Sequence, residues 1–285
     1  MSHYRFVFFG TPEIAVTALK GLSGEGLVPS LIVTAPDRPS GRGMKMTETP
    51  VKAYARTSDI PCISPEKITP DIIEHLTETG PWDFFIVVAY GKILRQPLLD
   101  IVNGKVINIH PSLLPLYRGP SPIESVLLSD DVETGVTVMQ IDADVDHGPT
   151  IAMEKFPIEK GILAQELETK SALIGARLIA LNIEAYAHDT KELTEQDHSI
   201  ATFTKKIQKI DGLLDESLSD WEKWKHYRAY TPWPGISMVV TKRGLPVRIK
   251  ITKAHYSDET FTIDECTPEN RKPLSEAGFK QWLSS

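Results

Sequence analysis

The stretch 105–123 concentrates side chains that could do chemistry, because Asn108, His110, Ser112 and Arg118 lie within eleven residues of each other. It begins as an apolar strand, residues 106–109, and continues as a polar, Pro-rich loop. Ligands of open α/β sheets bind outside the carboxyl ends of strands, and histidine is the side chain that exchanges protons most readily near neutral pH. This pattern favours a binding or catalytic site. In the simpler alternative, His110 is a hydrogen-bonded strand-end histidine and the prolines only stiffen the loop.

A second stretch, residues 135–149, supplies carboxylates that could act with His110. Residues 135–141 alternate as in a strand, and Asp142, Asp144 and Asp146 follow. A carboxylate beside the imidazole could orient the ring and stabilise its charged form.

The three aspartates also resemble the start of a calcium-binding loop. That motif requires a glycine at its sixth position and a glutamate at its twelfth. If Asp142 is the first position, these places hold His147 and Met153. The sequence therefore does not predict a calcium site here, and we expect no metal site elsewhere, since it has no Cys/His cluster with zinc spacing.

The elements that position these residues follow an alternating pattern of short apolar runs and helical stretches. Such alternation predicts βαβ units and an α/β fold with a mostly parallel, open twisted sheet. Thr11 is expected to cap the first helix, with Pro12 as its first residue. We expect strands at 5–9, 31–34, 84–88, 106–109, 135–141 and 150–157, and helices at 12–22, 51–58, 71–78, 93–101, 121–128 and 163–187.

Length and composition allow one large domain or two ordinary ones in 285 residues, of which 41% are hydrophobic. Only Cys62 and Cys266 occur, which fits a reducing cytoplasmic compartment. The beginning of the chain has no signal-peptide pattern, and no run approaches 18 apolar residues. We therefore expect a cytoplasmic protein without a membrane span, and we expect a monomer.

The net charge of −7 argues against a nucleic-acid partner, but the charge is unevenly distributed. The loop 35–52 carries Arg38, Arg42, Lys45 and Lys52 against two acids, and its prolines and glycines predict irregular structure. An exposed basic loop can follow a phosphate backbone. By composition alone, an ordinary solvated surface loop is the favoured interpretation.

The C-terminal third is the most basic part of the chain. After a polar linker, residues 189–204, the stretch 205–253 contains eleven basic and five acidic residues, a net charge of +6. Such asymmetry is typical of nucleic-acid binding. Short strands are expected at 236–240, 246–253 and 259–263, which predicts a small β domain.

The motifs N-x-H-x-S-L-L-P-x-x-R-G-x-x-P-I from Asn108, G-V-T-x-M from Gly135 and D-x-G from Asp146 together resemble one known family. This is the family of formyltransferases that use 10-formyltetrahydrofolate, and within it the branch whose acceptor is the initiator methionyl-tRNA of translation initiation. The resemblance extends over nearly the whole chain.

The resemblance implies a formyltransferase catalytic domain with a Rossmann-like sheet at 1–188, a linker at 189–204, and a C-terminal β-barrel that helps hold tRNA at 205–285. It also implies that Asn108, His110 and Asp146 are catalytic. Asn108 and charged His110 would stabilise the oxyanion that develops on the formyl oxygen. Asp146 would orient His110 or take the proton from the attacking amine.

The same resemblance implies ligand contacts. Folate would bind at the strand end Val88, Ala89 and Tyr90 and at the loop Ser112, Leu113, Leu114 and Pro115. Tyr90 could equally be a core aromatic, Leu113 and Leu114 could be ordinary core residues, and Arg118 could contact the substrate or brace the loop. The loop P-D-R-P-x-G-R-G would engage the acceptor end of tRNA through Arg38, Arg42 and Lys45.

Two features concern the C-terminal domain. The phrase R-A-Y-T-P-W-P resembles a family motif, and we expect a structural role in which Trp233 packs the domain. Little chain remains after Ala254, so the barrel is expected to be shortened.

Three other functions fit parts of the pattern. One is a formyltransferase for a small acceptor, such as an amino-sugar nucleotide or a glycinamide ribonucleotide, and another is a hydrolase of the formyl-folate. The third is a non-catalytic RNA-binding protein on the same fold. The intact set of Asn108, His110 and Asp146 favours catalysis, and the basic regions favour tRNA.

Overall fold

The computed structural model describes residues 4–40 and 43–285. Its contacts divide the chain into two compact units, each made of several segments. Unit 1 comprises Met1–Arg118, Thr134–Phe156 and Glu168–Phe203, and unit 2 comprises Gly119–Glu133, Pro157–Leu167 and Thr204–Ser285. The expected division into 1–188, a linker 189–204 and 205–285 groups residues 119–133, 157–167 and 189–204 differently from these units. None of the helices described is long and apolar enough to cross a membrane.

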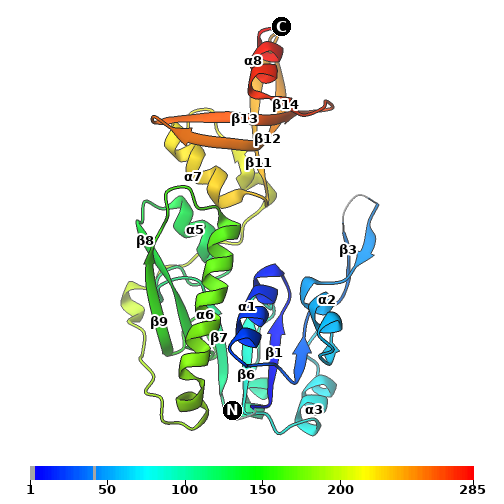
Figure 1. Ribbon diagram of the computed structural model, residues 1–285, viewed down its shortest axis with the longest axis vertical. Helices are drawn as coiled ribbons and strands as arrows, with labels where there is room; N and C mark the ends of the chain where they lie inside the picture. The colour runs from blue at the N-terminus through cyan, green and yellow to red at the C-terminus, as the bar shows by residue number, and fades with distance from the viewer. Residues whose placement is uncertain (1–3, 41–42) are drawn as a thin grey trace. The chain divides into compact units, whose positions relative to one another are not determined.

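Unit 1 is built on a seven-stranded sheet with the order β5-β2-β1-β6-β7-β8-β9, seen in Figure 1. The pairs from β5 to β7 are parallel, and β8 runs antiparallel to β7. The expected mostly parallel α/β sheet is therefore confirmed. The strands are β1 (Phe6–Gly10), β2 (Leu31–Val33), β5 (Cys62–Ile63), β6 (Phe84–Val88), β7 (Val106–His110), β8 (Glu133–Gln140) and β9 (Thr150–Pro157).

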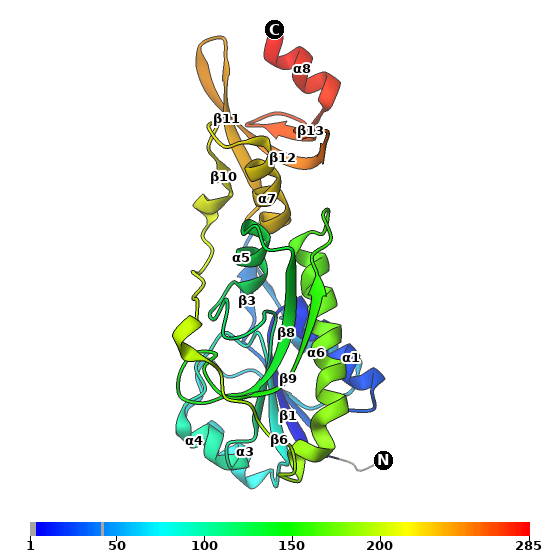
Figure 2. The ribbon, with the colours of Figure 1, turned by 90° about the vertical axis from the view of Figure 1, so that its left-hand side faces the viewer.

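Helices cover both faces of this sheet, as Figure 2 shows, with α1 and α6 on one face and α3 and α4 on the other. The helices are α1 (Glu13–Gly24), α2 (Pro50–Thr57), α3 (Pro70–Glu78), α4 (Gln96–Leu99) with the 3₁₀ turn Asp100–Val102, and α6 (Ala164–Ala187). Burial on both faces explains why β1 and β6 are apolar at every position except Gly10.

The alternation of side chains along β7 decides where the polar residues lie. Ile109 packs against Gly175 of α6, where an added Cβ would lie 2.4 Å from the Ile109 Cγ2 atom. Val106 belongs to the core on the opposite face, with Phe85, Val87 and residues of α3 and α4. Because successive strand residues point to opposite faces, Asn108 and His110 lie on the same face as Val106.

Three local expectations were wrong. The first helix begins at Glu13 with Pro12 as its N-cap, and the Thr11 hydroxyl instead accepts a hydrogen bond from the Ala35 backbone at 3.4 Å. The expected helix 93–101 is only the short α4 and its 3₁₀ turn, because Pro97 fits the first turn of a helix and so sets the start of α4 at Gln96. The basic loop is not irregular either, since β3 (Arg38–Ser40) and β4 (Lys45–Thr47) pair as an antiparallel hairpin.

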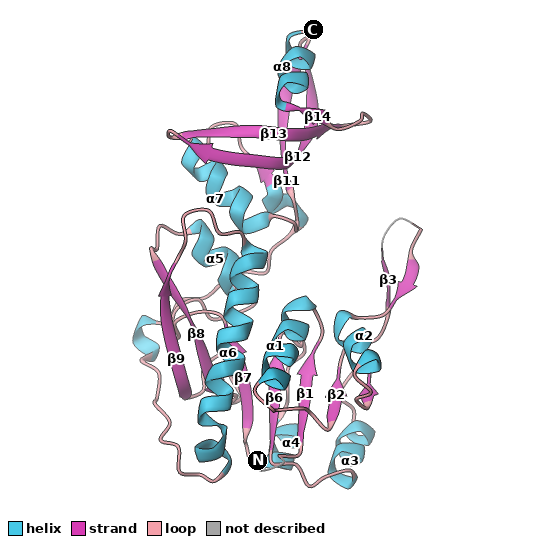
Figure 3. Ribbon diagram, viewed as in Figure 1, coloured by secondary structure: helices cyan, strands magenta, loops and turns pink. Residues whose placement is uncertain are grey.

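Unit 2 contains the expected small β domain, drawn in magenta strands in Figure 3. Its five strands pair in the order β10-β11-β12-β13-β14. Over the described residues, no pairing joins β14 to β10, and both of these edge strands are two residues long. In the part of the chain that the structure describes, the expected C-terminal barrel is therefore an open sheet. The elements are α5 (Pro122–Leu128), the 3₁₀ turn Lys209–Gly212, β10 (Leu213–Leu214), α7 (Asp220–Tyr230), β11 (Ile236–Lys242), β12 (Leu245–Ser257), β13 (Thr260–Pro268), β14 (Leu274–Ser275) and α8 (Glu276–Ser284).

Contacts between α5 and α7 explain why residues 119–133 belong to unit 2. The Lys225 ammonium lies 2.9 Å from the Asp130 carboxylate, and buried Arg228 donates to the Leu127 carbonyl at 3.4 Å. The R-A-Y-T-P-W-P motif has a structural role, because its first three residues, Arg228 to Tyr230, are buried. The expectation that Trp233 packs the domain was wrong, because this side chain is 54% exposed.

Candidate active site

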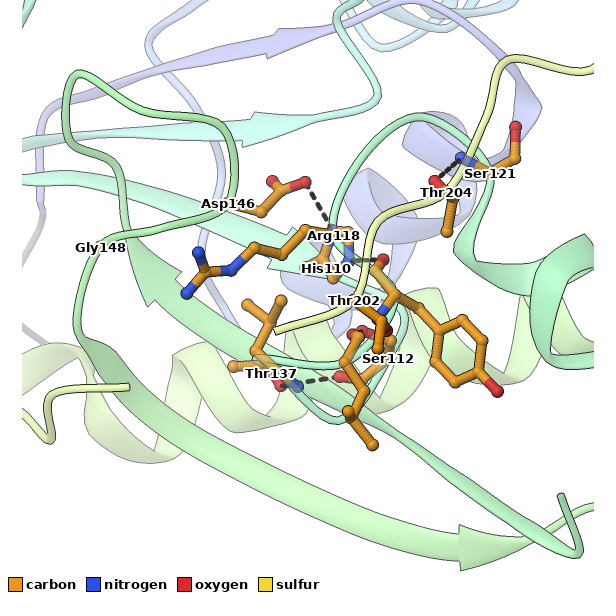
Figure 4. Close-up of polar contacts among 12 residues, drawn as sticks. His110, Ser112, Arg118, Ser121, Thr137, Asp146, Gly148, Thr202 and Thr204 are labelled. Carbon is orange, nitrogen blue, oxygen red and sulfur yellow. Dashed lines mark hydrogen bonds and ion pairs between the residues drawn. The ribbon is translucent and has the colours of Figure 1, made fainter. Parts of the chain in front are cut away.

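The imidazole of His110 is held at the end of β7 with an oxygen atom near each of its nitrogens. Its Nε2 donates to the Tyr117 carbonyl at 2.9 Å, and its Nδ1 lies 3.6 Å from Oδ2 of Asp146, as Figure 4 shows. The side chain of His110 is only 5% exposed. The ring is thus held between the Tyr117 carbonyl and the Asp146 carboxylate.

Asp146 comes from the loop after β8, which ends beside the start of β7, with Gln140 opposite Ile107. The antiparallel pairing of β7 with β8 places Thr137 opposite His110, and the chain returns through residues 141–149. Asp146 has a φ of +50°, an uncommon value for a residue other than glycine. The distance of 3.6 Å to His110 is within ion-pair range but too long for a direct hydrogen bond. Such catalytic contacts often shorten when a substrate binds.

Asn108 lies two residues before His110 on the same face of β7 and is half-buried. Within residues 4–40 and 43–285, the structure shows no hydrogen bond to its side-chain amide. A strand-end amide whose N–H groups are not engaged by the protein can donate to a ligand oxygen. The structure therefore brings the three predicted catalytic residues to one end of β7.

The loop after His110 is fixed by hydrogen bonds to its own backbone and to β8. The Ser112 hydroxyl donates to the Leu116 carbonyl at 2.6 Å, and Ser112 is fully buried. The Thr137 hydroxyl donates to the Ser112 carbonyl at 2.7 Å and accepts from the Leu114 backbone at 3.1 Å. Leu114 is also buried. Side chains of Ser112 and Leu114 thus hold the loop, and Leu113 packs against Gly135 of β8, where an added Cβ would lie 2.3 Å from the Leu113 Cδ2 atom. The backbone of the loop and Pro115 remain as the groups that could face a ligand.

The predicted folate segment 88–90 follows the end of β6, the parallel neighbour of β7. Val88 is buried, whereas Ala89 is exposed and has a φ of +47°. A left-handed alanine at a strand end is the kind of strained backbone that clusters at ligand sites. Tyr90 lies in the core, with its ring 5.5 Å from that of Phe9, and its buried hydroxyl has no hydrogen-bond partner among the residues that the structure describes.

The buried phenol of Tyr90 should make the stability of the protein depend on pH in the alkaline range. Burial raises its pKa to about 12 from the ordinary value of 10.0. The folded chain keeps the proton between these values while the unfolded chain loses it, so stability falls as pH rises from about 10 to 12. We expect Tyr90→Phe to remove this part of the alkaline loss, measured by urea unfolding at pH 8 and pH 11, and to leave folate affinity unchanged.

The matched control for Tyr90 is Tyr186→Phe. Burial raises the pKa of Tyr186 as well, but its hydroxyl donates to Gln140 at 3.0 Å. Its removal should therefore cost stability at pH 8, whereas removal of an unpartnered buried hydroxyl should not. Weaker folate binding by Tyr90→Phe would show instead that this hydroxyl contacts the ligand.

The predicted tRNA residues occupy the β3–β4 hairpin. Arg38 and Lys45 are exposed, and the Arg38 guanidinium forms an exposed ion pair with Glu66 at 2.7 Å. The exposed side chains of Met44 and Met46 flank Lys45. Arg42 lies outside the described residues.

A second set of side chains around the site includes Arg118, whose role the sequence left open, and Gln196 and Thr137, which were not predicted as site residues. Arg118 is 3% exposed and donates through Nη2 to Gln196 at 2.6 Å and to Nδ1 of His198 at 2.8 Å. Arg118 therefore braces the loop, one of the two roles left open for it. The motif G-V-T-x-M could have pointed to Thr137, whereas Gln196 lies in a polar segment with no distinguishing signal. Among the residues described, no group of three or more His, Cys, Asp or Glu side chains could hold a metal ion.

Comparison with known proteins assigns this arrangement to a family. The family model described as formyl transferase matches residues 4–183, which include all three residues at the end of β7. The chain belongs to the formyl transferase family.

Its relatives include two methionyl-tRNA formyltransferases. The one from Roseiflexus sp. (strain RS-1) is 41% identical over 86% of this chain and 75% of the relative. The one from Chloroflexus aggregans is 38% identical over 98% of this chain and 96% of the relative. A solved structure of an N-formyltransferase from Helicobacter canadensis, in complex with folinic acid and dTDP-3-aminofucose, has a TM-score of 0.62 at 20% identity and covers 91% of this chain and 95% of its own. This likeness shows that the fold is shared.

Proposed function

We propose that this formyltransferase moves the formyl group of 10-formyltetrahydrofolate to the α-amino group of initiator methionyl-tRNA. The observation that carries the proposal is the meeting of His110 and Asp146 at the end of β7 with the Asn108 amide, which no hydrogen bond engages within residues 4–40 and 43–285. The relatives with 38–41% identity, which are named for the tRNA substrate, support the choice of acceptor.

The reaction requires a stabiliser for negative charge and an acceptor for a proton. The neutral amine forms a bond to the formyl carbon, the bond from that carbon to N10 breaks, and the proton that the amine loses is returned to N10. Asn108 would donate an N–H to the formyl oxygen as negative charge develops there. The imidazolium form of His110 would add a second positively charged donor, which is how an oxyanion is stabilised in a buried site.

Asp146 can serve this reaction in two ways. Its carboxylate faces Nδ1 of His110, so it favours the charged ring electrostatically and fixes its orientation. It is also 17% exposed, so a water molecule can connect it to the attacking amine. Variants of Asp146 and His110, alone and combined, distinguish a role as the base from a role in orienting His110.

The folate would bind where β6 and β7 end side by side. The exposed, left-handed Ala89 offers backbone groups at the end of β6, and the braced loop from Ser112 to Pro115 offers them at the end of β7. A ligand lying across both strand ends would place its reacting atom near Asn108. The residues present therefore fit a flat, hydrogen-bonding ring system such as a pterin.

The tRNA would be held by exposed cations in both units. Several basic residues of unit 2 are already engaged: Lys225 and Lys223 pair with acids, and Arg228 is buried. Lys205, Lys206, Lys209, Arg248 and Lys250 remain exposed, in addition to Arg38 and Lys45 of the β3–β4 hairpin. These residues supply positive surface in a chain with a net charge of −7.

A prediction follows for Lys45. We expect Lys45→Ala to raise KM for tRNA and leave kcat nearly unchanged, because a phosphate contact contributes to binding and not to the chemical step. The slope of log affinity against log salt should fall by about 0.7 to 0.9 for each phosphate that the variant no longer neutralises. Lys20→Ala on α1, also exposed, is the control that should change neither quantity. An unchanged KM and salt slope for Lys45→Ala would remove this residue from the tRNA site.

The acceptor is tested by a formyl-transfer assay with 10-formyltetrahydrofolate. Charged initiator methionyl-tRNA, free methionine, an amino-sugar nucleotide and a glycinamide ribonucleotide are compared as acceptors, with a water-only reaction to detect hydrolysis. Transfer to the tRNA alone, weakened by salt, supports the proposal. Transfer only to a small acceptor, hydrolysis alone, or tRNA binding without transfer would replace it with the corresponding alternative.

A further inference from the structure

The loop that carries Asp146 is held by one side chain from a distant part of the sequence. Gln196 donates through Nε2 to the Asp146 carbonyl at 3.0 Å and to the Gly148 carbonyl at 2.7 Å. Its Oε1 accepts from Nη2 of Arg118 at 2.6 Å. Because Gln196 is 7% exposed and engaged at both ends of its amide, its orientation is fixed.

The Asp146 turn is a place where such support has a clear effect. Asp146 has a φ of +50°, which relaxes unless the surroundings hold it. Gln196 donates hydrogen bonds to the backbone on both sides of His147, at Asp146 and at Gly148. Gly148 cannot be replaced by a residue with a side chain unless the backbone moves, since an added Cβ would lie 2.1 Å from the Gln140 carbonyl oxygen. The Gln196 hydrogen bonds therefore help to set where the Asp146 carboxylate points.

The same polar segment also supports the other member of the pair. Thr202 accepts the Tyr117 backbone N–H through its hydroxyl at 2.8 Å, and its carbonyl accepts the Arg118 backbone N–H at 2.9 Å. Tyr117 has a φ of +61°, and its carbonyl is the one that accepts from His110. Figure 4 shows Thr202 beside this loop and Arg118 extending toward the Asp146 turn.

We propose that Gln196, oriented by Arg118, is a positioning residue that sets the geometry between Asp146 and His110. The segment from Gln196 to Thr202 is thereby part of the active site and not only a connection. The alternative is a purely structural role, in which these hydrogen bonds stabilise unit 1 without affecting the pair. The assay below rests on the proposed function, and the spectroscopic measurement that accompanies it does not.

The test uses the full chain with three substitutions. Gln196→Ala removes the whole amide. Gln196→Glu keeps an oxygen for Arg118 but cannot donate to the two carbonyls, so it isolates the contact with the Asp146 turn and retains a partner for the buried guanidinium. Glu195→Ala, at an exposed neighbouring position, is the matched control.

We expect both Gln196 variants to lower kcat by about 10- to 100-fold with little change in KM, because a small misplacement of catalytic groups affects the chemical step. In an Asp146→Asn background, Gln196→Ala should lower kcat by less than about 2-fold further, since residues that act through one another are not additive. A full, additive loss in that background would mean that Gln196 does not act through Asp146 and would overturn the proposal.

The activity-independent measurement is the pair of imidazole ¹⁵N resonances of His110 at a fixed pH. In Gln196→Ala and Gln196→Glu, these resonances should move in the same direction as in Asp146→Asn, and in Glu195→Ala they should stay in place. Unmoved resonances in both Gln196 variants would overturn the proposal. If the unmodified protein transferred no formyl group, the proposed function would fail while the resonances still decided the role of Gln196.

Discussion

Asp146→Asn is expected to lower kcat for formyl transfer by about 100- to 10,000-fold, which is the usual contribution of a positioned acid or base. The amide is nearly the same size as the carboxylate, so the loop should keep its shape. It has no negative charge to favour the imidazolium of His110 across the 3.6 Å between them, and it cannot take a proton from the amine. Steady-state rates with saturating tRNA and folate measure the effect, and urea unfolding checks that stability is retained.

The matched control is Asp144→Asn, because Asp144 is the same residue type two positions earlier in the loop and is exposed. We expect near-normal rates for it. His110→Ala should lose about as much activity as Asp146→Asn, and the double variant should lose little more if the two residues act as a unit. A loss in the double variant equal to the product of the two single losses would point to a base role for Asp146 that does not pass through His110. Near-normal turnover by Asp146→Asn would contradict the mechanism as a whole.

Asn108→Ala is expected to lower kcat by about 100- to 1,000-fold, the cost of removing one donor from an oxyanion site. The effect should fall on kcat and on kcat/KM equally, because the charge on the formyl oxygen develops in the transition state. Stability should change little, since the Asn108 amide makes no hydrogen bond within the described chain, 4–40 and 43–285. Rates measured with the tRNA and with the folate varied in turn give this comparison.

Asn108→Asp provides a second variant of the same size. Its carboxylate would repel the developing negative charge, so we expect a loss at least as large as that of Asn108→Ala. If both variants instead raised KM for the folate with kcat unchanged, Asn108 would be a ground-state binding residue. The oxyanion would then be left to His110 and backbone groups.

The sheet of unit 1 could be predicted from the sequence because its signals are strong and local. The continuous apolar run 84–88 corresponds to β6 without error, and α6 begins within one residue of its expected start. The β3–β4 hairpin was missed because prolines and glycines dominate the composition there, although an antiparallel pair needs only three residues on each side. The helix expected at 93–101 was shortened because Pro97 fits only the first turn of a helix, so α4 begins at Gln96 and the exposed Ile93 lies before it.

Residues of the candidate site could be predicted only where a chemically capable side chain lies at or shortly after the end of a strand. His110 ends β7, but antiparallel β8 ends opposite Ile107, so Asp146 meets His110 only because the loop 141–149 returns toward the His110 end of β7. Gln196 is 50 residues from Asp146 in a stretch of polar residues with a single short 3₁₀ turn. Nothing in its residue type distinguishes it from solvated neighbours such as Glu195. Its contact depends on where an irregular segment crosses the sheet, which no periodicity encodes.

The hydrogen bonds of residues 194–203 to the rest of unit 1 bear on how the protein could be re-engineered for another acceptor. A new C-terminal module is naturally joined where the long helix α6 ends, at Ala187. Such a junction would discard Gln196 and Thr202, and with them the supports of both Asp146 and the Tyr117 carbonyl. A chimaera that keeps the native chain through Phe203 retains these supports, which makes that residue the junction of choice for exchanging substrate specificity.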